Sequence, residues 1–227
     1  MSSEPFRSSA EGARLRSSAR ARILAAVLAA ACLLGADFGR PDPASFTLGQ
    51  TTEQEIRARF GKPAGEAATR VGGKLVTTLR YAYAEARSIA VPVRTMAYAF
   101  HEGRLVGFDY MSSFAADQTA FDELVGKRIK RGETTRTEVL DLVGKPSGQF
   151  IYPSAYATAP GRRADVYSHS RSEKLSSGVT LETTTKVLTI TYDEHDVVVE
   201  TNLVITTSSK PLKLTPDAGH PPHGGLS

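Results

Sequence analysis

The feature that most constrains the fold of this 227-residue chain is a block of sequence that occurs twice. One copy runs from Leu48 to Pro63 and the other from Arg131 to Pro146, with matching residues 83 positions apart. A repeat at a fixed spacing indicates that one supersecondary unit is used twice. The matched pairs are Gly49/Gly132, Thr52/Thr135, Glu55/Glu138, Ile56/Val139, Phe60/Val143, Gly61/Gly144 and Pro63/Pro146.

Each block predicts a short α-helix, because the signals that start and stop a helix are both present. Thr52 and Glu55 fit a capping box, in which hydroxyl and carboxylate satisfy free amides at the helix start. Gly61 fits a left-handed stop residue, and Pro63 prevents the helix from continuing. A helix of this length is unstable alone in water and must pack on other elements. The second block carries the same signals at Thr135, Glu138, Gly144 and Pro146.

Alternating apolar and polar residues follow each predicted helix, as in half-buried strands. Turns at 101–104 and 193–196 predict a final hairpin in each copy. Phe100 aligns with Tyr192, 92 positions away, so the second copy holds extra residues, which we place in a loop at 149–163. The expected strands are 79–83, 96–100 and 105–110 in the first copy and 166–170, 179–192 and 197–205 in the second.

These elements predict an α+β fold of two tandem modules. Each module is expected to be a short N-terminal helix, or helical pair, packed on an antiparallel β-meander of about three strands. The first module is placed at 46–111 and the second at 128–206, with a connector at 112–127. The tail at 207–227 is rich in proline, glycine and histidine, and we expect it to be disordered.

Residues 1–36 have the layout of an export signal. An arginine-rich stretch precedes the uncharged run Ile23 to Ala36, which is shorter than the ~20 residues that span a bilayer comfortably. Cys32, the one cysteine, follows small residues as in a bacterial lipobox, although Leu28 lies one position too far upstream. We predict lipidation of Cys32. One alternative is that Cys32 is only an apolar residue of a signal peptide that is cleaved near Ala36. The other is that the segment is not cleaved and anchors the protein in the membrane.

The charge distribution argues against nucleic-acid binding. The formal net charge is +4, but residues 1–31 hold five arginines and two glutamates, so the rest of the chain carries about +1. Phosphate binding needs a concentrated basic face, which this sequence lacks. A single cysteine also means that no intramolecular disulfide can form.

The histidines suggest no catalytic or metal site. His101 and His195 are expected in equivalent hairpin turns, exposed to solvent. His169 follows Ser168 in a strand, so their side chains point to opposite faces and cannot act as base and nucleophile. The other two histidines lie in the tail at 219–225, where disorder is the simpler interpretation. We therefore predict no enzyme activity, catalytic residue, metal or cofactor.

Two further patterns are interpreted as structural. Lys62 and Lys145 each follow a glycine, but the glycine and hydroxyl positions of a phosphate-binding loop are missing, and these segments close helices instead of opening them. Acidic residues between the two copies show no regular ligand spacing, so we expect a solvated linker and not a cation site. These residues are Asp109, Asp117, Asp122 and Glu123.

The helix that ends in Gly-x-Pro, followed by a meander whose last hairpin reads Phe100 to Val106, resembles the BamE (SmpA/OmlA) family of outer-membrane lipoproteins. The likeness spans 46–111 and 128–204, and the pairing resembles the tandem fold of the secreted β-lactamase inhibitor protein. The family's founding member has one module, whereas this chain has two. No partner-binding residue of the family matches a short motif here.

This resemblance implies a lipoprotein of the outer membrane that faces the periplasm and is anchored through Cys32. Its implied role is protein binding or scaffolding in outer-membrane assembly or maintenance, with envelope proteins such as the assembly machinery as partners. The alternative is a soluble, periplasmic or secreted inhibitor or interaction protein like the tandem inhibitor.

Overall fold

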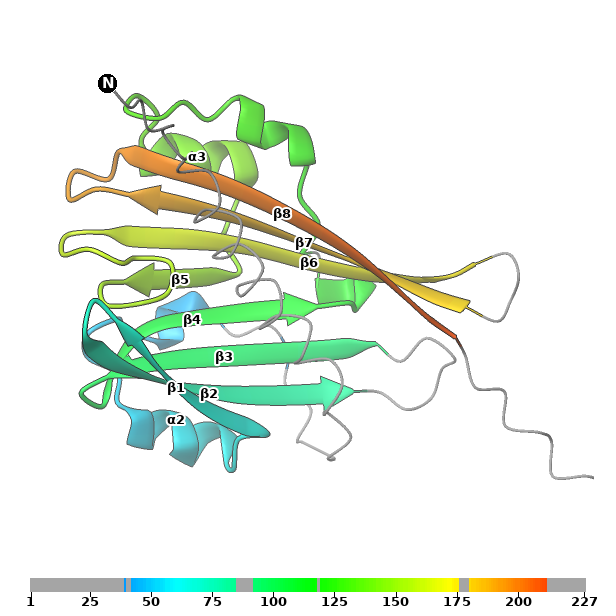
Figure 1. Cartoon of the computed structure of the whole chain (residues 1–227), viewed down its shortest axis with the longest axis horizontal. Coiled ribbons are helices and arrows are strands. Elements are labelled where there is room, and N and C mark those ends of the chain that lie inside the picture. The colour runs from blue at the N-terminus through cyan, green and yellow to red at the C-terminus, as the bar shows by residue number, and fades with distance from the viewer. Residues whose placement is uncertain (1–38, 40–41, 85–91, 118, 176–179, 212–227) are drawn as a thin grey trace, which may run out of the picture.

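The computed structural model describes residues 39, 42–84, 92–117, 119–175 and 180–211. Its main element is one continuous antiparallel sheet, in which the eight strands follow each other in chain order (Figure 1). The predicted fold of two separate helix-plus-meander modules is therefore wrong. The strands are β1 (Gly65–Val71), β2 (Lys74–Ala84), β3 (Val93–His101), β4 (Arg104–Ser112), β5 (Gly148–Ile151), β6 (Arg163–Lys174), β7 (Thr180–Tyr192) and β8 (Val198–Pro211).

The sequence did not predict β1 or β5, and β5 explains the difference. β5 pairs with β4 on one side, through Phe108 and Gln149, and with β6 on the other, through Gln149 and Asp165. This short strand satisfies backbone groups at the edge of β4 that would otherwise be unpaired, and it makes the two halves one sheet. Three of its four residues fall at the start of the predicted loop 149–163, of which only 152–162 connects strands.

The two blocks nevertheless form the same local structure. Helix α2 (Glu53–Phe60) and helix α3 (Arg136–Val143) each begin with a complete capping box, at Thr52 and Thr135. Gly61 ends α2 with φ 73° and ψ −146°, and Gly144 ends α3 with φ 88° and ψ −162°. This is not the left-handed helical region expected for a helix stop. It is a region of backbone space that only glycine occupies without strain.

Each helix is tied to the sheet by the same hydrogen bonds. The Tyr81 hydroxyl donates to the Gly61 carbonyl at 3.2 Å, and the Tyr167 hydroxyl donates to the Gly144 carbonyl at 3.0 Å. The turn before each helix is held in the same way, since Gly49 N–H donates to Leu105 O and Gly132 N–H to Val198 O, both at 2.7 Å. The repeated blocks therefore encode how a helix docks on a sheet.

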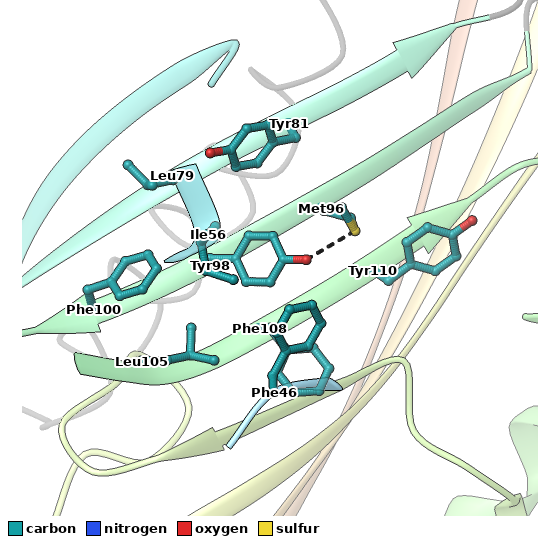
Figure 2. Packing of buried hydrophobic residues seen from close by; sticks show 10 residues of the cluster. All are labelled: Phe46, Ile56, Leu79, Tyr81, Met96, Tyr98, Phe100, Leu105, Phe108 and Tyr110. Atoms are coloured by element: carbon teal, nitrogen blue, oxygen red, sulfur yellow. Dashed lines mark hydrogen bonds between the residues drawn. The ribbon is translucent and has the colours of Figure 1, made fainter. Parts of the chain in front are cut away.

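Both helices cover the same face of the sheet, which we call the helix face. Ile56 of α2 packs in one cluster with Tyr98 and Phe108, which lie opposite each other in the strand register (Figure 2). Val139 of α3 packs in a second cluster with Leu188, on the same face of the sheet. The first cluster contains Phe46, Ile56, Leu79, Tyr81, Met96, Tyr98, Phe100, Leu105, Phe108 and Tyr110. The second contains Val125, Ile129, Val139, Tyr167, Leu188, Ile190, Tyr192 and Val198.

The connector is packed on the protein, which corrects the prediction of a solvated acidic linker. Its 3-10 helix η3 (Ala115–Asp117) places Asp117 in a bidentate ion pair with Arg94, at 2.9 and 3.1 Å. Arg94 also lies over the Phe114 ring, 4.1 Å from its centroid. A second 3-10 helix, η4 (Glu123–Lys127), is capped by Asp122 and paired through Glu123 with Lys186.

The chain remains ordered beyond the expected second module. β8 continues to Pro211 and pairs with β7 over its whole length, so the boundary at residue 206 was placed too early. The remaining part of the predicted tail lies outside the described residues, as does the predicted signal at 1–36 with Cys32. In the described part of the chain, no helix has the length and apolar character needed to cross a membrane.

Candidate functional site

The face of the sheet opposite the helices, which we call the open face, is the candidate site. The strand register places Arg80, Ala97, Asp109 and Gly148 side by side on β2 to β5. Arg80, Ala97 and Asp109 are each half-buried, so their side chains reach the surface of this face without projecting far from it. The centre of the open face thus combines a low floor of small residues with one cation and one carboxylate.

Aromatic side chains close one end of the open face. Phe150 lies over Gly107, where a Cβ atom would come within 1.9 Å of the ring, so only glycine fits beneath it. The loop 152–162 then folds over the same end and packs Tyr156 against Phe150, with ring centroids 4.6 Å apart and the ring planes inclined by 59°. Tyr152 of this loop reaches the β1–β2 hairpin, where the Lys74 ammonium lies 5.7 Å from its ring centroid. We call this group the aromatic end.

Away from the aromatic end, hydroxyl groups of β6 and β7 line the open face. Ser170 pairs with Thr185 at 3.4 Å, and Ser172 pairs with Thr183 at 3.0 Å, across β6 and β7. Cross-strand hydroxyl pairs of this kind stabilise neighbouring strands while keeping the surface polar.

Asp109 is the most perturbed acid of the open face. Its carboxylate accepts hydrogen bonds from the hydroxyls of Ser147, at 3.2 Å, and Ser168, at 3.3 and 3.2 Å to the two oxygens. Burial raises the pKa of Asp109 to about 6, although these hydrogen bonds favour its charged form. The site therefore carries a carboxyl group that changes charge close to neutral pH.

The structure does not bring His169 and Ser168 together as a base and a nucleophile. Ser168 faces Asp109 on the open face, whereas His169 lies on the helix face, with its Nδ1 3.0 Å from the Thr119 hydroxyl. Burial lowers the pKa of His169. The sequence-based expectation that Ser168 and His169 point to opposite faces is confirmed by these contacts.

The two turn histidines differ from each other. His195 is exposed, as expected, but only 14% of the His101 side chain is accessible, and its Nδ1 lies 2.9 Å from the Leu75 carbonyl oxygen. His101 borders a cavity of about 510 Å³ beside the start of α2, together with Glu53, Lys74 and Phe100. A smaller cavity, about 210 Å³, lies between the connector and β6 and reaches Ser147 and Ser168.

The remaining predicted sites are distributed as follows. The motif residues of the two blocks lie on the helix side of the protein, at the ends of α2 and α3, and do not form part of the open face. Cys32 and the two tail histidines lie outside the described residues. Across the described ranges, no three histidine, cysteine, aspartate or glutamate residues gather as metal ligands would.

Sequence reasoning did not place Arg80 and Asp109 in one row of the sheet, on either side of Ala97, because it assigned Asp109 to the linker. The signal that could have found it is the alternation around Asp109, which stands between the buried residues Phe108 and Tyr110 and must therefore point to the opposite face of a strand.

Comparison with known proteins gives one distant structural likeness. No known family matches the sequence, and no curated protein matches it significantly. A proposed β-lactamase inhibitor protein from Streptococcus mutans has a similar structure, with 10% sequence identity, a TM-score of 0.39, and coverage of 71% of this chain and 91% of that one. At this distance the likeness does not identify the function, and the resemblance to the BamE family is not shown.

Proposed function

We propose that this chain is an exported, non-enzymatic protein-binding module that holds a partner protein on its open face. The observation that carries the proposal is the placement of both helices on one side of the sheet. This placement leaves the half-buried Arg80–Ala97–Asp109 row without a covering helix, between the aromatic end and the hydroxyl-lined strands.

The residue types of the open face suit protein recognition. Tyrosine and arginine are among the side chains that contribute most to binding energy at protein interfaces. Tyr152, Tyr156 and Arg80 all retain partial exposure. The alanines and glycines between them let a partner's backbone approach closely. A partner segment that offers a cation to Asp109 and a carboxylate or carbonyl group to Arg80 would be electrostatically complementary.

Export rests on the sequence of residues 1–36 and remains part of the proposal. A soluble interaction protein needs only the face described above, whereas a lipid anchor at Cys32 would in addition hold that face near a membrane. The outer-membrane assembly role implied by the BamE resemblance stays an expectation.

Site-specific photo-crosslinking in the producing cells tests the proposal. A photoreactive residue at Ala97 should give a discrete protein adduct, and the same residue at Asp141, which is exposed on α3, should not. Arg80→Glu should abolish the Ala97 adduct, whereas Arg128→Glu, which makes the same charge change on the exposed end of η4, should leave it intact. Equal adducts at Ala97 and Asp141, or an adduct that survives Arg80→Glu, would contradict the proposal.

A further inference from the structure

Beyond Val198, whose backbone N–H and C=O bond to Thr134 and Gly132, the outer edge of β8 is long and unpaired within the described part of the chain. β8 is the last strand of the sheet, and its inner edge pairs with β7 from Val198 to Pro211 (Figure 1). An edge of this kind presents a row of backbone N–H and C=O groups that can pair with another strand. In the repeat, β8 corresponds to β4, whose equivalent edge is covered by β5.

The sequence of β8 favours pairing. Native edge strands are usually protected by charges or proline, but the segment between Glu200 and Lys210 has neither, and its middle is rich in β-branched residues. Val204 and Ile205 are 40% and 46% exposed, among the few large apolar residues that are. Proline follows only at the end, at Pro211.

We propose that β8 pairs antiparallel with β8 of a second copy of this chain, around a two-fold axis at Ile205. In this register the facing residues have numbers that add up to 410, so Glu200 faces Lys210 of the second copy and Lys210 faces its Glu200. These two are the charged residues of the strand, and they lie at equal distances from Ile205. Charge complementarity within a single strand is what a self-pairing edge requires.

The rest of the strand fits the same register. Residues that face each other are both odd-numbered or both even-numbered, so each pair lies on one face of the sheet, as antiparallel pairing demands. Ile205 meets its own copy, flanked by Leu203 against Thr207 on the helix face, while Asn202 meets Ser208 on the open face. The interface uses the same surface twice and closes on itself, so it gives a dimer and not a filament.

Charge reversal tests the register. Sedimentation equilibrium of the full chain should show a dimer in the micromolar range. Glu200→Lys and Lys210→Glu should each raise the dimer dissociation constant about tenfold or more, because each single change turns two attractive pairs into two repulsive ones. The double variant Glu200→Lys/Lys210→Glu should restore dimerisation. A double variant that is as weak as the singles overturns the proposed register.

Cysteine cross-linking tests the geometry independently, in a Cys32→Ser background. Ile205→Cys should form a dimer with a short bis-maleimide, because facing Cβ atoms lie about 5 Å apart. Thr201→Cys should not react with its own copy, which would be about 27 Å away along the strand. Mixing Thr201→Cys with Ser209→Cys should restore the cross-link.

Three results would overturn the proposal. The first is a chain that stays monomeric at 100 µM. The second is a dimer that survives Ile205→Lys, a change that places two lysines at the two-fold axis. The third is a Thr201→Cys variant that cross-links to its own copy as readily as Ile205→Cys does. Circular dichroism of each variant separates a lost dimer from a lost fold, since Ile205 is half-exposed and not part of the buried clusters.

Discussion

Replacing Asp109 by asparagine should stabilise the protein at neutral pH. The raised pKa of Asp109, about 6 against an ordinary 3.8, means that the folded protein binds this proton more tightly than the unfolded chain does. The contribution of Asp109 to stability is therefore full below pH 3.8 and is lost as the pH rises through 6. Asparagine keeps an oxygen that can accept from Ser147 or Ser168, and it does not titrate.

The magnitude follows from the size of the shift. A change of roughly two pKa units corresponds to about 3 kcal/mol of unfolding free energy. Because Asp109 retains part of its accessible surface, we expect Asp109→Asn to gain about 1–2 kcal/mol relative to the native chain between pH 4 and pH 7.5. Other titrating groups, such as Asp165, are present in both proteins, so their effects cancel in the difference.

Urea denaturation at half-unit pH intervals measures this difference. The unfolding free energy of Asp109→Asn minus that of the native chain should increase from pH 4 to pH 6.5 and then level off. Asp141→Asn, on the exposed side of α3, controls for the change from carboxylate to amide. A difference that is independent of pH, or that falls as the pH rises, would refute the argument that burial dominates at Asp109.

Three further changes test other parts of the structure. Gly144→Ala should lower the unfolding free energy measured by urea denaturation by about 1–3 kcal/mol, because Gly144 has a positive φ, although nothing crowds the added methyl group. Gly126→Ala is the control: Gly126 also lies in open space but has no positive φ, so the loss should be far smaller. Arg136→Met should cost about 2–4 kcal/mol, because it leaves the Asp165 carboxylate, which is 2% exposed, without its bidentate partner; a loss below 1 kcal/mol would contradict this. If Cys32 is lipidated, Cys32→Ser should move the protein out of the membrane fraction, and a soluble native protein that begins near Asp37 would exclude the anchor.

The sequence predicted local structure better than global structure, for a physical reason. Caps, turns and apolar stripes depend on residues within a few positions of each other, so Thr52, Glu55 and Gly61 were sufficient to define one helix. The pairing of β4 with β5 depends instead on backbone groups, which every residue carries. A strand of four residues such as β5 also shows too little alternation to be recognised from sequence. The joining of the two halves, which depends on β5, was therefore not predicted.

The candidate site shows what the joining adds to the repeat. Leu105 and Val198 are equivalent, because each accepts the same hydrogen bond from the turn before a helix. Counting four residues on from each makes Asp109 of β4 equivalent to Asn202 of β8. Asp109 is contacted by Ser147 and Ser168, which belong to the second half, whereas Asn202 is exposed because no described strand follows β8. The same position is therefore a half-buried acid where a neighbouring strand covers it and an exposed residue where none does. The perturbed carboxyl of the open face is a product of the tandem arrangement, and neither half could form it alone.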